Sequence, residues 1–291
     1  MRSRGAVFWY SLGLTLLLLL PMIGLTWFFV RQRQQQNELR QAAAERGGLA
    51  VEQGAQDSWR ALLVVQQEEP GFVLVRVDGP VQTVTLCALP GELQVQAPAG
   101  TTTLADCTLS AGPGRAAQLL QQTLATGETA RSTLYYLAAT PDCWADCAGS
   151  EITARLDTAA LLTKEEREQI GYGEDSVAEV SAGEAPELIA RLQSCQEMPG
   201  RRADMRAAVW EAFARQNTSL LAGMPQAWRE HSARTLTDLM ATDLAGWEAT
   251  LNYISGQPGL KVEYCTAGTR AAGGEVVLNE EGVRTVKELL Q

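Results

Sequence analysis

A period-two alternation of apolar and polar positions marks the first part of the folded region. Ala61–Val65, Phe72–Asp78 and Val81–Leu89 alternate in this way and are rich in β-branched residues, which predicts three strands. An Asp-Gly-Pro turn signal separates the second strand from the third, so these two are expected to form a hairpin. Leu93–Gln96 predicts a short fourth strand.

Helical spacing follows, mixed with further apolar strands. Arg115–Leu124 is apolar at every third or fourth position and predicts a helix. Leu134–Ala139 and Ile152–Leu156 predict two more strands. Thr163–Glu166 has the sequence of a capping box, which predicts the start of a short helix.

The second half of the chain is mostly helical in pattern. Its predicted helices are Glu187–Cys195, Ala203–Arg215, Met224–His231 and Asp243–Ile254. Lys261–Cys265 and Glu275–Leu278 predict late strands, and Asn279 is expected to cap a last helix. Because strands and helices mix without a break in composition, we predict one α/β domain over residues 61–291, with a central mixed sheet flanked by helices.

An uncharged apolar segment, Gly5–Val30, precedes this domain. As a helix it would reach roughly 39 Å, which exceeds the roughly 30 Å hydrocarbon core of a bilayer. Aromatic residues lie near both of its ends, as in interfacial belts. We therefore predict a cytoplasmic leader and a transmembrane helix over residues 1–30, with a cleaved signal peptide as the alternative. Residues 31–60 are expected to form a polar helical stalk or a disordered linker.

Charge does not decide on which side of the membrane the domain lies, because basic residues flank both ends of the span. The six cysteines are an even number, compatible with disulfides in an oxidising compartment and equally with buried thiols. Short leaders usually stay inside, so we expect a single-pass protein of the cell membrane with an extracytoplasmic domain. An unrelated domain facing the cytoplasm is the alternative, and free thiols on all six cysteines would favour it.

Composition excludes some functions. The net charge is −10, which disfavours general binding of nucleic acid, and the single histidine excludes chemistry that needs two or three. Cys143 and Cys147 share one face if their segment is helical, but a metal site would need two more ligands.

The strongest basic cluster lies at the start of the predicted helix Ala203–Arg215. Arg202 and Arg206 are one turn apart there, and Arg191 joins them if the preceding helix folds back. The planar guanidinium of arginine can donate two parallel hydrogen bonds to the oxygens of a diphosphate. The alternative is a solvated helix face with an internal partner in Asp204.

Several stretches of this domain resemble the LytR-CpsA-Psr (LCP) family of cell-envelope phosphotransferases. They are Val81–Val95, Leu104–Leu124, Leu134–Leu156, Glu184–Gln216 and Thr242-Asp243-Leu244. The first is similar to the family strand that ends in serine-isoleucine-proline-arginine-aspartate, with Pro90 kept and Glu92 in place of the aspartate. In the fourth, Arg191 and Arg202 match family arginines, and Met205-Arg206 falls on an arginine-glutamine pair.

The resemblance implies transfer of glycopolymers from a polyprenyl-diphosphate carrier to peptidoglycan. Arg191, Arg202 and Arg206 would then contact the diphosphate, and Glu92 would be the remaining ligand of Mg²⁺, the cofactor of an active member. The implied partners are the membrane, the polyprenyl-diphosphate-linked glycopolymer and peptidoglycan.

Departures from the family pattern predict a degenerate site. Val64–Gln67 replaces a glycine-x-aspartate, Gly91 stands where an arginine belongs, and most of the next loop is missing before Phe72. Because a diphosphate transition state needs preorganised cations, these losses leave open whether the chain is an enzyme. The alternative is a non-catalytic membrane-tethered binding or regulatory module of the envelope. An open apolar tunnel beside Arg202 would favour carrier binding.

Overall fold

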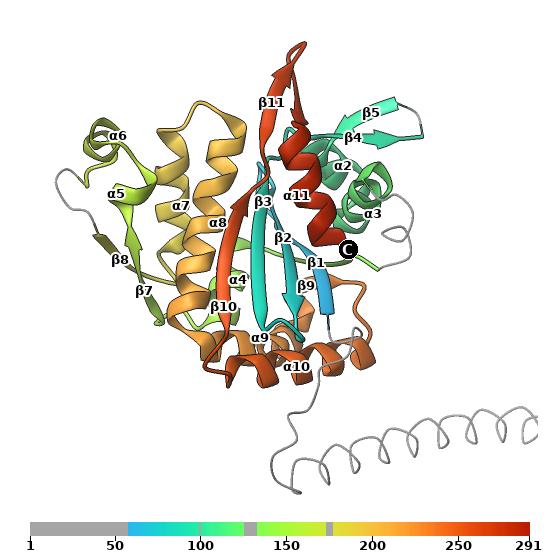
Figure 1. Ribbon diagram of the computed structural model, residues 1–291, viewed down its shortest axis with the longest axis vertical. Helices are drawn as coiled ribbons and strands as arrows, with labels where there is room; N and C mark the ends of the chain where they lie inside the picture. The colour runs from blue at the N-terminus through green and yellow to red at the C-terminus, as the bar shows by residue number, and fades with distance from the viewer. Residues whose placement is uncertain (1–57, 99, 125–132, 173–176) are drawn as a thin grey trace, which may run out of the picture. The chain divides into compact units, whose positions relative to one another are not determined.

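Six strands form a mixed central sheet in the computed structural model, which describes residues 58–98, 100–124, 133–172 and 177–291 (Figure 1). The strands are β1 (Ser58–Val65), β2 (Gly71–Asp78), β3 (Thr83–Leu89), β6 (Tyr135–Ala139), β9 (Thr235–Thr237) and β10 (Lys261–Thr266). Their order across the sheet is β10-β3-β2-β1-β6-β9. The pairs β1–β6 and β3–β10 are parallel, and the other neighbours are antiparallel.

Three small two-stranded sheets surround the central one. Their strands are β4 (Gln94–Ala97) with β5 (Gly100–Thr103), β7 (Thr153–Asp157) with β8 (Val177–Ser181), and β11 (Thr269–Ala272) with β12 (Glu275–Leu278).

Helices cover both faces of the central sheet. The helices are α2 (Leu104–Ala111), α3 (Pro113–Leu124), α4 (Pro141–Ala148), α5 (Thr158–Leu161), α6 (Lys164–Gln169), α7 (Ala185–Ser194), α8 (Pro199–Gln216), α9 (Thr218–Glu230), α10 (Ala241–Ser255) and α11 (Glu280–Leu290), with a 3₁₀ turn at Ser232–Arg234. In Figure 1, α2, α3 and α11 lie on one side of the sheet and α7 and α8 on the other. The predicted α/β fold with a central mixed sheet flanked by helices is confirmed.

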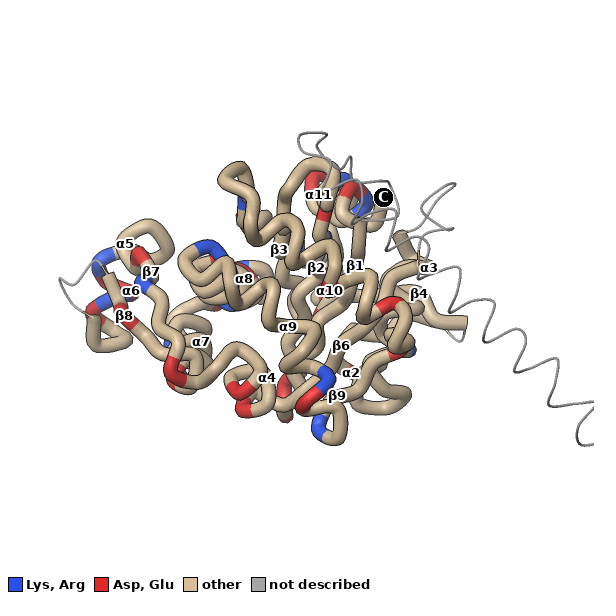
Figure 2. Tube along the Cα trace, turned by 90° about the horizontal axis from the view of Figure 1, so that it is seen from below, with Lys and Arg blue, Asp and Glu red and all other residues tan. Residues whose placement is uncertain are grey.

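The alternation read from β1 separates two cores. Leu63 and Val65 join a core under α4, α8, α9 and α10, whereas Leu62 and Val64 join a core under α2, α3 and α11. This follows because successive side chains of a strand point to opposite faces. A third core joins the β7–β8 sheet to α7 and α8. Strands β1, β2, β3 and β6 are mostly tan in Figure 2, since few of their side chains are charged.

Two predicted caps are confirmed. The N–H of Thr163 donates to the Glu166 carboxylate (2.7 Å), and the N–H of Glu166 donates to the Thr163 hydroxyl (3.3 Å), which completes the capping box of α6. The Asn279 side chain accepts from the N–H of Gly282 (2.8 Å) at the start of α11.

Several short elements were not predicted from the sequence, namely α2, β5, α5, β8, β9 and β11. Helix α9 also begins at Thr218 instead of Met224 and continues through Pro225. The proline removes one backbone donor, but packing of Leu221 and Trp228 against the core keeps the helix in place.

Among the residues that the structure describes, no helix is long and apolar enough to cross a bilayer. The span predicted over Gly5–Val30 lies outside those residues.

Candidate functional site

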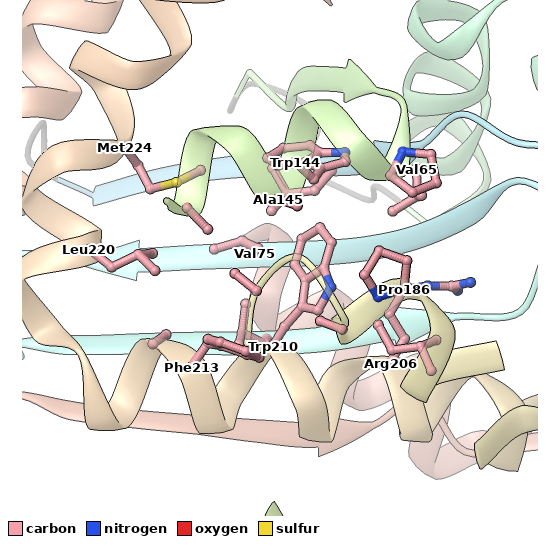
Figure 3. Close-up of a pocket in the computed structure, with 18 of the residues that line it drawn as sticks. Val65, Val75, Trp144, Ala145, Pro186, Arg206, Trp210, Phe213, Leu220 and Met224 are labelled. Atoms are coloured by element: carbon pink, nitrogen blue, oxygen red, sulfur yellow. The ribbon is translucent and has the colours of Figure 1, made fainter. Parts of the chain in front are cut away.

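A cavity of about 190 Å³ lies between the central sheet and the helices on one of its faces. Its walls come from β1, β2 and β3 on the sheet side and from α4, α7, α8, α9 and α10 on the helix side. The lining is almost entirely apolar. Figure 3 shows Arg206 and Pro186 near one end, Leu220 and Met224 near the other, and the Trp144 and Trp210 rings between them.

The spacing of α8 explains how one helix supplies both the charged and the apolar wall. Arg206, Trp210, Phe213 and Ala214 line the cavity, and residues three, four, seven and eight positions apart share one face of a helix. The strands contribute alternate residues, such as Leu63 on β1.

Arg206 is a buried cation without a partner. Its side chain is 6% exposed, and burial lowers the pKa of its guanidinium to about 10. Within the described residues, no hydrogen bond or ion pair joins it. A buried charge is costly unless it is paired, so this guanidinium is suited to an anion that enters the cavity.

Gly71, the first residue of β2, makes room for that guanidinium. A Cβ added at this position would overlap the guanidinium carbon of Arg206. The absence of a side chain is therefore what lets the arginine lie against the start of the strand. Nothing in the sequence pattern singled out this glycine.

The other predicted site residues are already engaged. Arg202 forms an ion pair with Glu92, and its guanidinium also donates to the Glu197 carbonyl (3.5 Å). Arg191 pairs with Glu187 (3.8 Å) and lies 5.9 Å above the ring of Tyr172. The structure therefore brings Arg202 together with Glu92, while Arg206 alone of the three arginines lines the cavity.

Carboxylates do not gather around the cavity. No group of three or more His, Cys, Asp and Glu residues that could hold a metal ion occurs in the part of the chain that is described. Asp204, two residues before Arg206, is 9% exposed, and burial raises the pKa of its carboxyl to about 6 although nearby Arg201 acts in the opposite direction. Glu92, the residue predicted as a Mg²⁺ ligand, forms an ion pair with Arg202.

Tryptophans are site residues that the sequence reading missed. Trp144 is fixed by donating its indole N–H to the Val64 carbonyl (3.2 Å), and its ring lies 5.2 Å from that of Trp210. The indole nitrogen of Trp247, which also lines the cavity, is buried without a hydrogen-bond partner in the described residues. Fixed rings of this kind give the cavity rigid apolar walls.

The six cysteines are free thiols in the structure. Cys143 and Cys147 lie on α4, one turn apart as their spacing predicted. Cys87 and Cys265 are direct neighbours on the parallel strands β3 and β10, with a hydrogen bond between their side chains.

Known structures share this fold. No family model and no curated protein matches the sequence. "TagT bound to LIIa-WTA" aligns with a TM-score of 0.59 at 16% identity, covering 84% of this chain and 96% of that one. B. subtilis TagU aligns at 0.51 and 11% identity, covering 81% and 97%. A putative transcription regulator from Eubacterium siraeum aligns at 0.60 and 11% identity, covering 83% and 94%.

These similarities define the class of the fold and no more. The domain has an LCP-like fold, like that of the LCP proteins TagT and TagU. At 10–17% identity the shared fold does not establish the activity of this chain.

Proposed function

We propose that this chain is a divergent LCP-like protein of the cell envelope that binds the lipid end of a polyprenyl-phosphate-linked glycopolymer. The prenyl chain would occupy the apolar cavity, and Arg206 would contact the phosphate. The observation that carries the proposal is the unpartnered, buried guanidinium of Arg206 in the wall of an apolar cavity. An amphiphile with an apolar tail and an anionic head complements both features.

The same geometry favours binding without transfer. Transfer from a diphosphate carrier to peptidoglycan would need Mg²⁺ and several cations aimed at the departing phosphate. Glu92 and Arg202 pair with each other instead, and Arg191 forms an exposed ion pair with Glu187. We therefore place the chain with the non-catalytic binding or regulatory modules of the envelope, with Mg²⁺-dependent transfer to peptidoglycan as the alternative.

Membrane attachment is part of the proposal. The segment Gly5–Val30 would hold the domain outside the cell membrane, close to a lipid carrier. The free thiols favour the opposite orientation, because an oxidising compartment would favour disulfides. Treating whole cells with a membrane-impermeant protease tests the orientation. A domain outside the membrane is cleaved in intact cells, and a domain inside is cleaved only after lysis.

Binding is tested with the full 291-residue chain in detergent micelles. Long-chain polyprenyl phosphate esters and the uncharged polyprenol are titrated against it by calorimetry. We expect the esters to bind at least about tenfold more tightly than the alcohol, since a charged hydrogen bond is worth about 1.5–3 kcal/mol.

Two arginine variants on α8 make the test specific. Arg206→Met should remove the preference for the phosphate esters. Arg215→Met changes an exposed arginine of the same helix, paired with Glu211, and should leave binding unchanged. Failure of every ester to bind would end the carrier-binding proposal.

A further inference from the structure

We propose that the cavity accepts an amphiphile with a single anionic group and that it binds this ligand without a metal ion. This deepens the proposed function, because it rests on the same cavity and narrows the head group from phosphate esters in general to one with a single phosphate or another lone anion.

The charges of the cavity wall limit the number of anionic groups that a buried ligand can carry. Of the described residues that line the cavity, Arg206 is the only one with a charged side chain. Two glutamines also line the cavity, but each donates a side-chain amide hydrogen bond to a backbone carbonyl: Gln67 to Glu69 (2.8 Å) and Gln193 to Arg202 (2.7 Å). One guanidinium can neutralise one anionic group through a two-pronged hydrogen bond, and a second buried anion would stay unpaired.

The residues around Arg206 also disfavour a second anionic group on the ligand. Arg202 lies one turn before it on α8, at the place where a second phosphate would find a cation. That arginine is held by Glu92. Gly91, the residue before Glu92, lies close to the Pro70 carbonyl. Pro70 directly precedes Gly71, where the guanidinium of Arg206 lies, so the backbone next to Glu92 is near the start of β2.

A diphosphate would therefore place its second charge near a carboxylate. The Glu92 side chain would repel it, and drawing Arg202 away from its partner would leave that carboxylate unpaired. A divalent cation that bridges a diphosphate is usually held by one or two protein carboxylates besides the phosphate oxygens. The described residues that line the cavity include no Asp or Glu, and Glu92 is paired with Arg202.

The head group is tested with short-chain probes on the full-length chain in detergent. Farnesyl monophosphate, farnesyl diphosphate, farnesol and palmitate are titrated in EDTA and again in Mg²⁺. We expect the monophosphate to bind at least about tenfold more tightly than the diphosphate and the alcohol, with the same affinity in EDTA and in Mg²⁺.

A paired variant sharpens the test. Glu92→Gln releases Arg202 and removes the repelling carboxylate. Because water screens this exposed pair, the variant should raise the affinity for farnesyl diphosphate by up to about fivefold and leave the monophosphate unchanged. Glu187→Gln releases Arg191 in the same way but away from the cavity lining, and should change neither affinity.

Each result decides between the two proposals. Tighter, Mg²⁺-dependent binding of the diphosphate would overturn the single-anion inference and leave carrier binding intact. Palmitate binding as tightly as the monophosphate would support a lone anion while overturning the polyprenyl carrier as its source. Farnesol binding as tightly as the monophosphate, or no binding of any probe, would overturn both.

Discussion

The two faces of the central sheet present similar apolar side chains, but the helices pack against them differently. On the face under α3, Leu119, Leu120 and Leu124 fill the space against the strands. On the face under α8, three helices contribute small residues to the cavity wall, namely Ala145 of α4, Ala190 of α7 and Ala214 of α8. These small side chains leave volume between the layers, and the cavity lies there.

The difference shows that the side chains of the covering helices determine on which face of the sheet a cavity remains. The strands cannot decide it, because β1 sends a leucine to each face at consecutive positions, Leu62 and Leu63. One of the helices that leave this space also carries charge into it. Asp204 and Arg206, both on α8, are the buried charged residues of the described chain.

The largest effect is expected when the two leucines of β1 are each replaced by alanine. Leu62→Ala should lower the free energy of unfolding by about 4 kcal/mol, because the fully buried side chain leaves a new void in a filled core. Leu63→Ala should cost about 2 kcal/mol, since its side chain already borders open space. Urea unfolding of both variants measures the difference. Equal losses would mean that the two faces are packed equally well.

The second test concerns the buried carboxyl of α8. The folded protein keeps the Asp204 proton up to about pH 6, whereas the unfolded chain releases it near the ordinary pKa of 3.8. Stability from this group is therefore present below pH 3.8 and lost as the pH rises through 6. Asp204→Asn should stabilise the protein by about 2–3 kcal/mol at pH 8 and have little effect at pH 3.5.

Unfolding of both proteins across that pH range gives the measurement for Asp204. A stabilisation that does not depend on pH would show that the carboxyl is not the group responsible. Glu211→Gln removes another carboxylate of the same helix and serves as the matched control.

The third test separates folding from binding at Arg206. Replacing this unpaired buried cation by methionine should raise the free energy of unfolding of the empty protein by about 2 kcal/mol, because the desolvated charge disappears. The same variant should lose its affinity for anionic amphiphiles. Thermal unfolding with and without farnesyl monophosphate measures both effects. A less stable Arg206→Met protein would show that the guanidinium has a structural partner.

The smallest expected effect belongs to the Arg202–Glu92 pair. Both side chains are more than a third exposed, so water and salt screen the attraction. A double-mutant cycle with Arg202→Ala and Glu92→Ala should give a coupling energy below about 1 kcal/mol that falls further in high salt. A larger, salt-resistant value would mark the pair as a buried structural element.

Much of the fold was predictable because its signals are local. The β-branched run in Phe72–Asp78, the capping box at Thr163 and the Asn279 cap each depend on a few neighbouring residues. Elements of three to five residues, such as β9 and β8, lack the length to show a period, and they exist because a partner strand pairs with them.

The candidate site was predictable only in part. The sequence placed Arg202 and Arg206 one turn apart, but it could not show that one of them faces Glu92 while the other faces a cavity. Which face of α8 is buried depends on the strands beneath it and on the position of Gly71, 135 residues earlier in the chain. The small residues of α7 and α8 are the signal that could have indicated open space.

The contact between Gly71 and Arg206 also bears on how the chain can change over evolutionary time. Any side chain at position 71 would displace the guanidinium, so the two positions are expected to vary together among descendants of this sequence. A larger residue at position 71 would push the guanidinium away from the start of β2 and alter the proposed contact with an anion. Selection for the ligand would then act on two positions that lie far apart in the gene.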